Sequence, residues 1–343
     1  MTNLTESQTS SDANVDVASS GPSKKYSATA LGTFFAIISA LGYTGASIAL
    51  RDLAMRGDAD WALWVTCMKA LPAASIAWLL IAYRASRGLP ALPPRRLVFP
   101  LILCGLLVQI FGNVLIQWAF RYVGLALTVP ISFATLLCCS ALLGRIFLLE
   151  VLTSRTLISM ALLTLAIILL CFGAESASTV LVSEASSFDT VFWGALAAGV
   201  AGVAYGMNGI VIRNIVTRDI SLSATLVLIS TTGFVSLGLL SLWRVGLTEI
   251  LATSQRDMAI MLAAGTLNAI AFFALSAALK YVTVTQVNLL NSSQTAMAAA
   301  AGVFLFGESL TVWLTLGIAL TVVGLLLMDN RPRDKHTKTD VDG

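Results

Sequence analysis

About ten long apolar runs follow one another along this sequence, separated by short segments that carry Gly, Pro or charged residues. Each run is close to the roughly 20 residues that a helix needs to cross a bilayer. Backbone groups in lipid must bond within their own segment, so these runs predict helices, whereas a membrane barrel would show short alternating segments. We expect the spans at residues 28–50, 61–83, 97–118, 124–147, 155–173, 189–212, 221–243, 258–279, 283–306 and 309–328.

The composition excludes a water-soluble fold. Of the 343 residues, 57% are hydrophobic and 11% are charged, which is less than half the charged share typical of globular chains. A soluble domain of this length could not bury that much apolar surface. The net charge is only +3 and no basic stripe appears, so we expect no nucleic-acid partner. The lipid bilayer is the expected surrounding of an all-α membrane protein.

Cysteine and histidine offer no chemistry inside the membrane. The five cysteines lie in apolar runs without zinc-ligand spacing, and His336 lies in the polar C-terminal segment. The sequence has no H-E-x-x-H, no P-loop and no paired intramembrane aspartates. We therefore expect no enzyme activity, no cofactor, no metal and no direct drive by ATP. A channel is disfavoured because no filter element is recognisable.

Basic residues predict the orientation. Segments 1–26 and 329–343 are polar and are expected to be disordered cytoplasmic tails, with 174–188 as an outer loop. With the N-terminus in the cytoplasm, most lysines and arginines fall in cytoplasmic segments, as the positive-inside rule requires. We expect both termini in the cytoplasm, in the plasma (inner) membrane. The basic residues that then lie outside are Arg51, Arg56, Arg121, Arg244 and Arg256.

The two halves of the chain repeat each other. "YTGASIALR", from Tyr43, aligns with "YGMNGIVIR", from Tyr205, and the stretch from Arg121 aligns with the stretch from Lys280. Five spans per half is an odd number, so the second half must cross the membrane in the opposite sense. Such inverted repeats are typical of secondary transporters, with the substrate near the midplane between the halves. A duplication kept only for stability would leave the same trace. The expected architecture is ten transmembrane helices in two inverted five-helix repeats, residues 27–173 and 189–328.

An acidic corner before the last span of each half carries a family resemblance. The second half, "LKYVTVTQVNLLNSSQTAMAAAAGVFLFGESLTVWLTLGIALTVVGLLLM", resembles the EamA-like branch of the drug/metabolite transporter (DMT) superfamily. The first half keeps Glu150 in "LEVLTSRT" but has Leu149 where the glycine is expected. The resemblance implies a secondary transporter, an exporter by alternating access, with a small polar or amphipathic metabolite as substrate. A non-transporting membrane scaffold or sensor on the same fold is the alternative, and homodimer formation is left open.

A polar helix face in the ninth span is the first candidate site. Asn288, Asn291, Ser292 and Thr295 recur at i, i+3, i+4 and i+7 in an otherwise apolar region. These side chains could form interhelical hydrogen bonds, which bundles often use. Two amides and two hydroxyls are more than helix adhesion usually needs, so we favour the wall of a substrate cavity.

Further polar groups are expected to face the same cavity. Tyrosines of the repeat lie at matching places in spans one and six, where each could also be ordinary core with a satisfied hydroxyl. Repeat-related half-sites would converge at the midplane. The candidate residues are Gln109, Asn113 and Gln117 in span three, Tyr43 and Ser47 in span one, and Tyr205 and Asn208 in span six.

Lys69 is the only basic residue well inside an expected span. It lies about 12 Å along a helix from Trp61 at roughly 1.5 Å per residue, near the middle of a core about 30 Å thick. It could anchor an anionic group of the substrate or reach the interface along its apolar stem. Glu150 and Glu308 lie at span ends, where each is expected to cap the N-terminus of the next helix.

Overall fold

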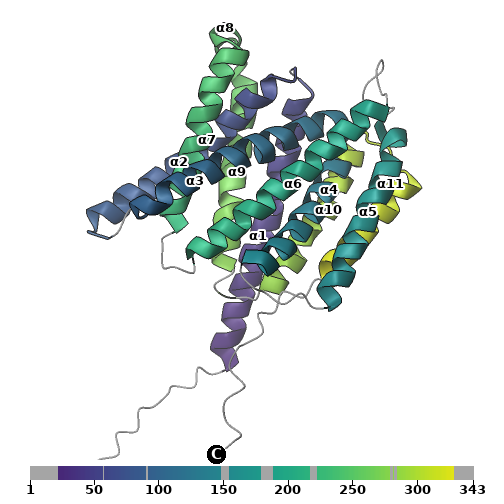
Figure 1. Cartoon of the computed structure of the whole chain (residues 1–343), viewed down its shortest axis with the longest axis horizontal. Helices are drawn as coiled ribbons and strands as arrows, with labels where there is room; N and C mark the ends of the chain where they lie inside the picture. Colours follow the sequence, from purple (N-terminus) through teal and green to yellow (C-terminus); the bar gives the residue numbers. More distant parts are fainter. Residues whose placement is uncertain are drawn as a thin grey trace, which may run out of the picture.

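The computed structural model describes residues 22–56, 58–89, 92–147, 154–178, 188–216, 222–278, 281 and 284–327 (Figure 1). These residues form α helices and one π-helical segment, and no strand occurs among them. The all-helical class predicted from the sequence is confirmed. The helices are α1 (Pro22–Ala54), α2 (Trp61–Ser86), α3 (Arg95–Leu107), η1 (Val108–Val114), α4 (Leu115–Phe147), α5 (Ser154–Ser178), α6 (Phe188–Val216), α7 (Leu222–Arg244), α8 (Leu247–Leu251), α9 (Gln255–Ala278), α10 (Val284–Phe306) and α11 (Val312–Leu327).

The expected third and fourth spans are continuous with each other. The helix that runs through α3, η1 and α4 is interrupted only at Gly124, whose φ of 77° and ψ of −179° are not helical. This backbone conformation is essentially restricted to glycine, because a Cβ would clash with the backbone. The chain turns at Gly124 without a loop, and the fourth span begins directly after it.

Six helices are long and apolar enough to cross a membrane by length and composition. One of them, Arg95–Phe147, is 53 residues long and contains the interruption at Gly124, so it has the length of two crossings. Shorter apolar helical stretches cover Ser154–Leu170, Ser293–Phe306 and Val312–Gly324. The molecule is therefore a multi-pass integral membrane protein.

Helices from the two halves of the chain pack directly against each other. The main pairs are α4 with α6, α1 with α9, α2 with α7, and α5 with α11. In Figure 1, α5 and α11 lie side by side at one edge of the bundle, and the short helix α8 lies at the end where α7 stops and α9 starts. The largest group of buried apolar side chains joins α1, α2, α4, α7, α9 and α10.

Several expected features lie outside the described residues or change their bounds. α1 begins at Pro22 and α5 ends at Ser178, so helix extends into segments 1–26 and 174–188, which were expected to be tail and loop. Residues 1–21, 179–187 and 328–343 are outside the described part of the chain, as is Glu150. The expected disorder of both tails therefore stays a prediction.

Candidate binding cavity

A cavity of about 450 Å³ lies between the two halves of the bundle. It extends from Leu50 and Phe120, near the end where α8 lies, to Leu226 and Leu275, near the opposite ends of α7 and α9. Its volume is within the range of small-molecule sites. The polar residues that line it are Tyr43, Ser47, Lys69, Gln109, Asn113, Ser132, Tyr205, Asn208, Ser230, Asn268, Asn291 and Gln294.

A connected set of hydrogen bonds crosses the cavity. Lys69 Nζ donates to Asn113 Oδ1 at 2.6 Å, and the Tyr205 hydroxyl donates to the same oxygen at 2.9 Å. Asn113 Nδ2 in turn donates to Gln109 Oε1 at 2.8 Å. The four side chains come from α2, η1 and α6, so this amide–lysine–tyrosine network joins three helices across the boundary between the halves.

The π-helical segment η1 places both amides of the network. Gln109 and Asn113 lie within Val108–Val114, where the backbone has the wider π turn. Such segments are rare and occur often at functional sites. On the facing helix α7, a Cβ at Gly233 would overlap the Gln109 amide. Glycine at position 233 therefore gives the Gln109 side chain the room it needs.

Seven of the ten predicted site residues line the cavity, although substrate contact by any of them stays a prediction. Thr295 does not line it; its side chain is fully buried and its Oγ1 has no hydrogen-bond partner within the described part of the chain. The side chains of Asn288 and Ser292 lie outside the described residues. The seven are Tyr43, Lys69, Gln109, Asn113, Tyr205, Asn208 and Asn291.

The structure adds lining residues that the helical pattern did not single out. Gln294 lies three residues after Asn291 and its Nε2 donates to Asn291 Oδ1 at 3.2 Å, so the polar face of α10 turns toward Gln294 and away from Thr295. Asn268 of α9 also lines the cavity. The signal that could have found Asn268 is a lone amide in an apolar run, which is costly in a membrane and is usually functional.

Gln117 departs from the predicted face. Its Nε2 donates to the carbonyl of Leu50 at 2.8 Å, and its side chain is buried between α1 and α4 without lining the cavity. The prediction assumed a 3.6-residue turn throughout, but the wider turn of the π segment Val108–Val114 changes the register between the side chains within it and those that follow it. Gln117 thereby serves helix packing.

Lys69 does not reach an interface. Only 8% of the residue is exposed, and its Nζ lies in the network with Asn113. The alternative that it extends along its apolar stem to the membrane surface is therefore wrong. Lys69 is also the one charged group among the described residues that line the cavity.

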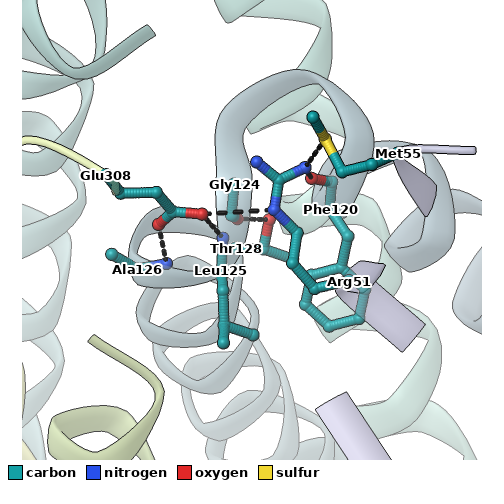
Figure 2. A network of polar contacts seen from close by, with 8 residues as sticks. All are labelled: Arg51, Met55, Phe120, Gly124, Leu125, Ala126, Thr128 and Glu308. Atoms are coloured by element: carbon teal, nitrogen blue, oxygen red, sulfur yellow. Dashed lines mark hydrogen bonds and ion pairs between the residues drawn. The ribbon is translucent and has the colours of Figure 1, made fainter. Parts of the chain in front are cut away.

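A buried ion pair adjoins the Leu50–Phe120 end of the cavity (Figure 2). Arg51 is fully buried, and its Nε donates to Glu308 Oε1 at 3.2 Å. Arg51 Nη1 donates to the Phe120 carbonyl and to Met55 Sδ. Arg51 was counted as an outer loop charge from the sequence, and the structure instead places it inside the protein.

Glu308 caps a different helix from the expected one. Its Oε1 accepts from the Leu125 N–H at 2.7 Å and its Oε2 accepts from the Ala126 N–H at 2.8 Å, at the start of the helical run that follows Gly124. The next helix, α11, is capped by Thr311, whose Oγ1 accepts from the Leu314 N–H. The expected capping of α11 by Glu308 is therefore wrong, and the carboxylate joins α4 to the segment after α10.

The groups that line the cavity are suited to hydrogen bonding with a solute. Among the residues that the structure describes, no group of three His, Cys, Asp or Glu side chains could hold a metal ion. Most of the residues that line it are apolar or aromatic, and its polar groups are, apart from Lys69, neutral amides and hydroxyls. A second hollow of about 440 Å³ between α4 and α6 is lined mainly by apolar and aromatic residues, so it offers few groups to a polar solute.

Comparisons with known proteins agree with this geometry. Residues 192–328 match the EamA-like transporter family, so the C-terminal half carries a domain of that family, as the sequence predicted. No curated protein matches the chain. A solved structure titled "Crystal structure of protein" shares the fold: its TM-score is 0.53 at 18% identity, over 88% of this chain and 96% of that one. A domain of this family indicates a DMT-type membrane transporter, and proteins of the family are typically not enzymes.

Proposed function

We propose that this chain, with its EamA-like transporter domain at residues 192–328, is a secondary transporter that exports a small polar or amphipathic metabolite by alternating access. The observation that carries the proposal is the cavity of about 450 Å³ between the halves of the bundle, with its lining of amides and hydroxyls. Polar groups at this depth are expensive in a membrane and mark substrate pathways. A scaffold would need no such cavity.

The proposal includes ten crossings in two inverted five-helix halves. The sequence alignment pairs α1 with α6 and the helix after Gly124 with α10. The order of the spans then pairs α2 with α7, α3 and η1 with α9, and α5 with α11. In support, α2 packs on α7, α4 on α10 and α5 on α11, so counterpart helices meet as they do around a shared two-fold axis. Tyr43 and Tyr205, which the alignment also pairs, both line the cavity.

Flux through the purified protein tests the proposal. Proteoliposomes loaded with a mixture of labelled metabolites should release at least one of them in a saturable way, while protein-free liposomes should not. Ala73 lines the cavity, so Ala73→Trp should fill it and abolish that release. Ala82, exposed on the same helix, gives the matched control Ala82→Trp, which should leave release unchanged.

Two outcomes would contradict the proposal. No release of any metabolite from vesicles that contain folded, inserted protein would favour the scaffold or sensor. Full release through a folded Ala73→Trp variant would mean that the solute takes another route. The direction of transport is read from vesicles of defined orientation, in which export predicts movement from the cytoplasmic to the outer side.

A further inference from the structure

Among the described residues that line the cavity, Lys69 is the one charged group, and no described carboxylate pairs with it. Among the described residues, no carboxylate lies within the 4.0 Å that defines an ion pair with Lys69, whereas Arg51 and Arg244 each have one and Arg56 has two. Lys69 is 8% exposed. An unpaired buried cation is costly, so its retention in a cavity points to a negative group that arrives with the ligand.

The network around Lys69 holds the ammonium in place without neutralising it. An ammonium group has three donors, and Asn113 Oδ1 accepts one of them at 2.6 Å. The Tyr205 hydroxyl donates to the same oxygen, and Asn113 is itself anchored on Gln109. With respect to the described residues, two N–H donors of Lys69 thus stay available at a fixed position, which is the arrangement that an incoming carboxylate or phosphate oxygen requires.

The rest of the cavity is suited to an apolar body. Phe133 and Leu136 of α4 and Phe272 and Phe273 of α9 line it. A polar ligand with several charges would leave these walls unused and would bring charges that no described lining residue can pair. A zwitterion fits less well than an anion, because its ammonium group would meet no described carboxylate in the cavity.

We propose that the cavity takes an amphipathic organic anion, with one negative group on Lys69 Nζ and an apolar body against the phenylalanines. This proposal rests on the proposed transport function and names the charge class of the solute. Lys69 supplies the charge, and Asn113 positions it. The net charge of the described lining, one positive group among neutral ones, favours a single negative charge on the ligand.

Matched ligands test the charge class by equilibrium binding. The probes are 3-phenylpropionate and indole-3-butyrate, each with its primary amide and the corresponding primary amine, titrated calorimetrically into the purified full chain. The carboxylates should bind about ten- to a hundredfold more tightly than the amides, the range expected for a hydrogen bond to a charged group. The amines should bind most weakly, because they bring a second positive charge to Lys69.

Variants assign the preference to Lys69. Lys69→Met should bring carboxylate and amide to equal affinity, and Lys69→Arg should keep the preference because the charge remains. Arg87→Met is the matched control: Arg87 is exposed at the end of the same helix, about 27 Å away at roughly 1.5 Å per residue, and its removal should change nothing. If Lys69→Met does not fold, the ligand series on the unaltered protein decides the charge class by itself.

Clear outcomes overturn the proposal. They are equal affinity of carboxylate and amide, tighter binding of the amine, no carboxylate binding with either body, or a carboxylate preference that survives Lys69→Met. Failure of this proposal is distinct from failure of transport. If amides exchange across proteoliposomes while carboxylates do not bind, the charge class is wrong and transport stands. If carboxylates bind through Lys69 but no vesicle exchanges them, transport is wrong and the charge class stands.

Discussion

At Asn113, one side-chain amide serves three neighbours: it accepts from Lys69 and from Tyr205, and it donates to Gln109. Asn113 therefore takes part in every hydrogen bond of the network, and replacing it affects more than one bond. Replacing Tyr205 would remove one donor, whereas replacing Asn113 would strand the Lys69 ammonium without any acceptor that the structure describes. The cost of a buried unsatisfied charged group exceeds the net gain of an ordinary hydrogen bond.

Asn113→Leu should lower the free energy of unfolding by about 1–3 kcal/mol, because it removes the one acceptor that the structure describes for the Lys69 ammonium. In the double variant Lys69→Met/Asn113→Leu no ammonium remains. Adding Asn113→Leu to Lys69→Met should therefore lower the free energy of unfolding much less than Asn113→Leu does in the unaltered protein. The measurement is a double-mutant cycle on thermal unfolding in detergent. Additive effects of the two substitutions would mean that the 2.6 Å contact contributes nothing to stability.

Asn291→Leu should leave the thermal stability almost unchanged. Within the described residues, Asn291 bonds only Gln294, its neighbour on the same helix, and both line the cavity, where the Gln294 amide can find water. Solute affinity should fall about ten- to a hundredfold if Asn291 contacts the solute, the effect of about 1–3 kcal/mol for one lost buried hydrogen bond. Thr295→Val, off the cavity, should leave the affinity unchanged. A loss of stability with full affinity would identify the polar face of α10 as a helix contact.

At the scale of elements, the Arg51–Glu308 pair joins α1, α4 and the segment after α10 at one end of the cavity. The two side chains differ in the other partners that each one has. Glu308 also accepts two backbone N–H groups at a helix N-terminus, where a negative charge is favoured. Besides Glu308, Arg51 bonds the Phe120 carbonyl and Met55 Sδ, and its guanidinium lies over the Phe306 ring, 5.7 Å from the ring centroid. Its Nη2 has no hydrogen-bond partner among the described residues.

Glu308→Met should therefore destabilise the protein more than Arg51→Met. Breaking a buried pair from one side costs about 3–5 kcal/mol, and we expect Glu308→Met near the upper value and Arg51→Met near or below the lower one. Chemical unfolding in mild detergent measures both. Exchange of the residues, Arg51→Glu with Glu308→Arg, should not restore stability, because an arginine cannot accept the N–H groups of Leu125 and Ala126. Equal losses in the single variants would rule out the helix N-terminus as a second partner of Glu308.

Gly124→Ala should abolish folding or cost at least about 3 kcal/mol, since two separate penalties coincide there. The conformation at φ 77° excludes a Cβ, and that Cβ would also overlap the Glu308 carboxylate. Gly88 allows the backbone penalty to be measured without the overlap. Its φ is 66°, but no atom lies within 4 Å of the position that a Cβ would occupy. Gly88→Ala should cost only the backbone strain, about 1 kcal/mol. Thermal unfolding of the two variants gives the comparison.

The sequence predicted the elements better than the contacts between them. Hydropathy located the helices within a few residues, because in lipid the length and apolarity of a segment largely determine its structure. Periodicity located Gln109 and Asn113 but misplaced Gln117, since a π segment cannot be read from a regular turn. The Arg51–Glu308 pair spans 257 residues and therefore produces no local pattern. Asn268 belongs to no periodic polar face, so a search for periodicity does not find it.

At the scale of the whole molecule, ion pairs mark one end of the bundle. Arg56 Nη1 lies 2.7 Å from Asp257 Oδ1, and Arg244 Nη2 lies 3.1 Å from Asp60 Oδ1. With the buried Arg51–Glu308 pair, three arginines at the end where α8 lies are thus matched by carboxylates. These are among the few arginines that the predicted orientation places outside. The pairs reduce the net positive charge at that end.

Labelling of introduced cysteines tests that orientation. Glu249, exposed on α8, and Ala85, exposed in the last turn of α2, lie in segments that the ten-crossing arrangement places on opposite sides. In a background without the five native cysteines, Glu249→Cys should react with a membrane-impermeant maleimide in intact cells. Ala85→Cys should react only after permeabilisation, because the basic segment that follows α2 stays in the cytoplasm. The reverse pattern would invert the orientation and, with it, the direction of the proposed transport. Reaction of both cysteines from one side would contradict the crossings themselves.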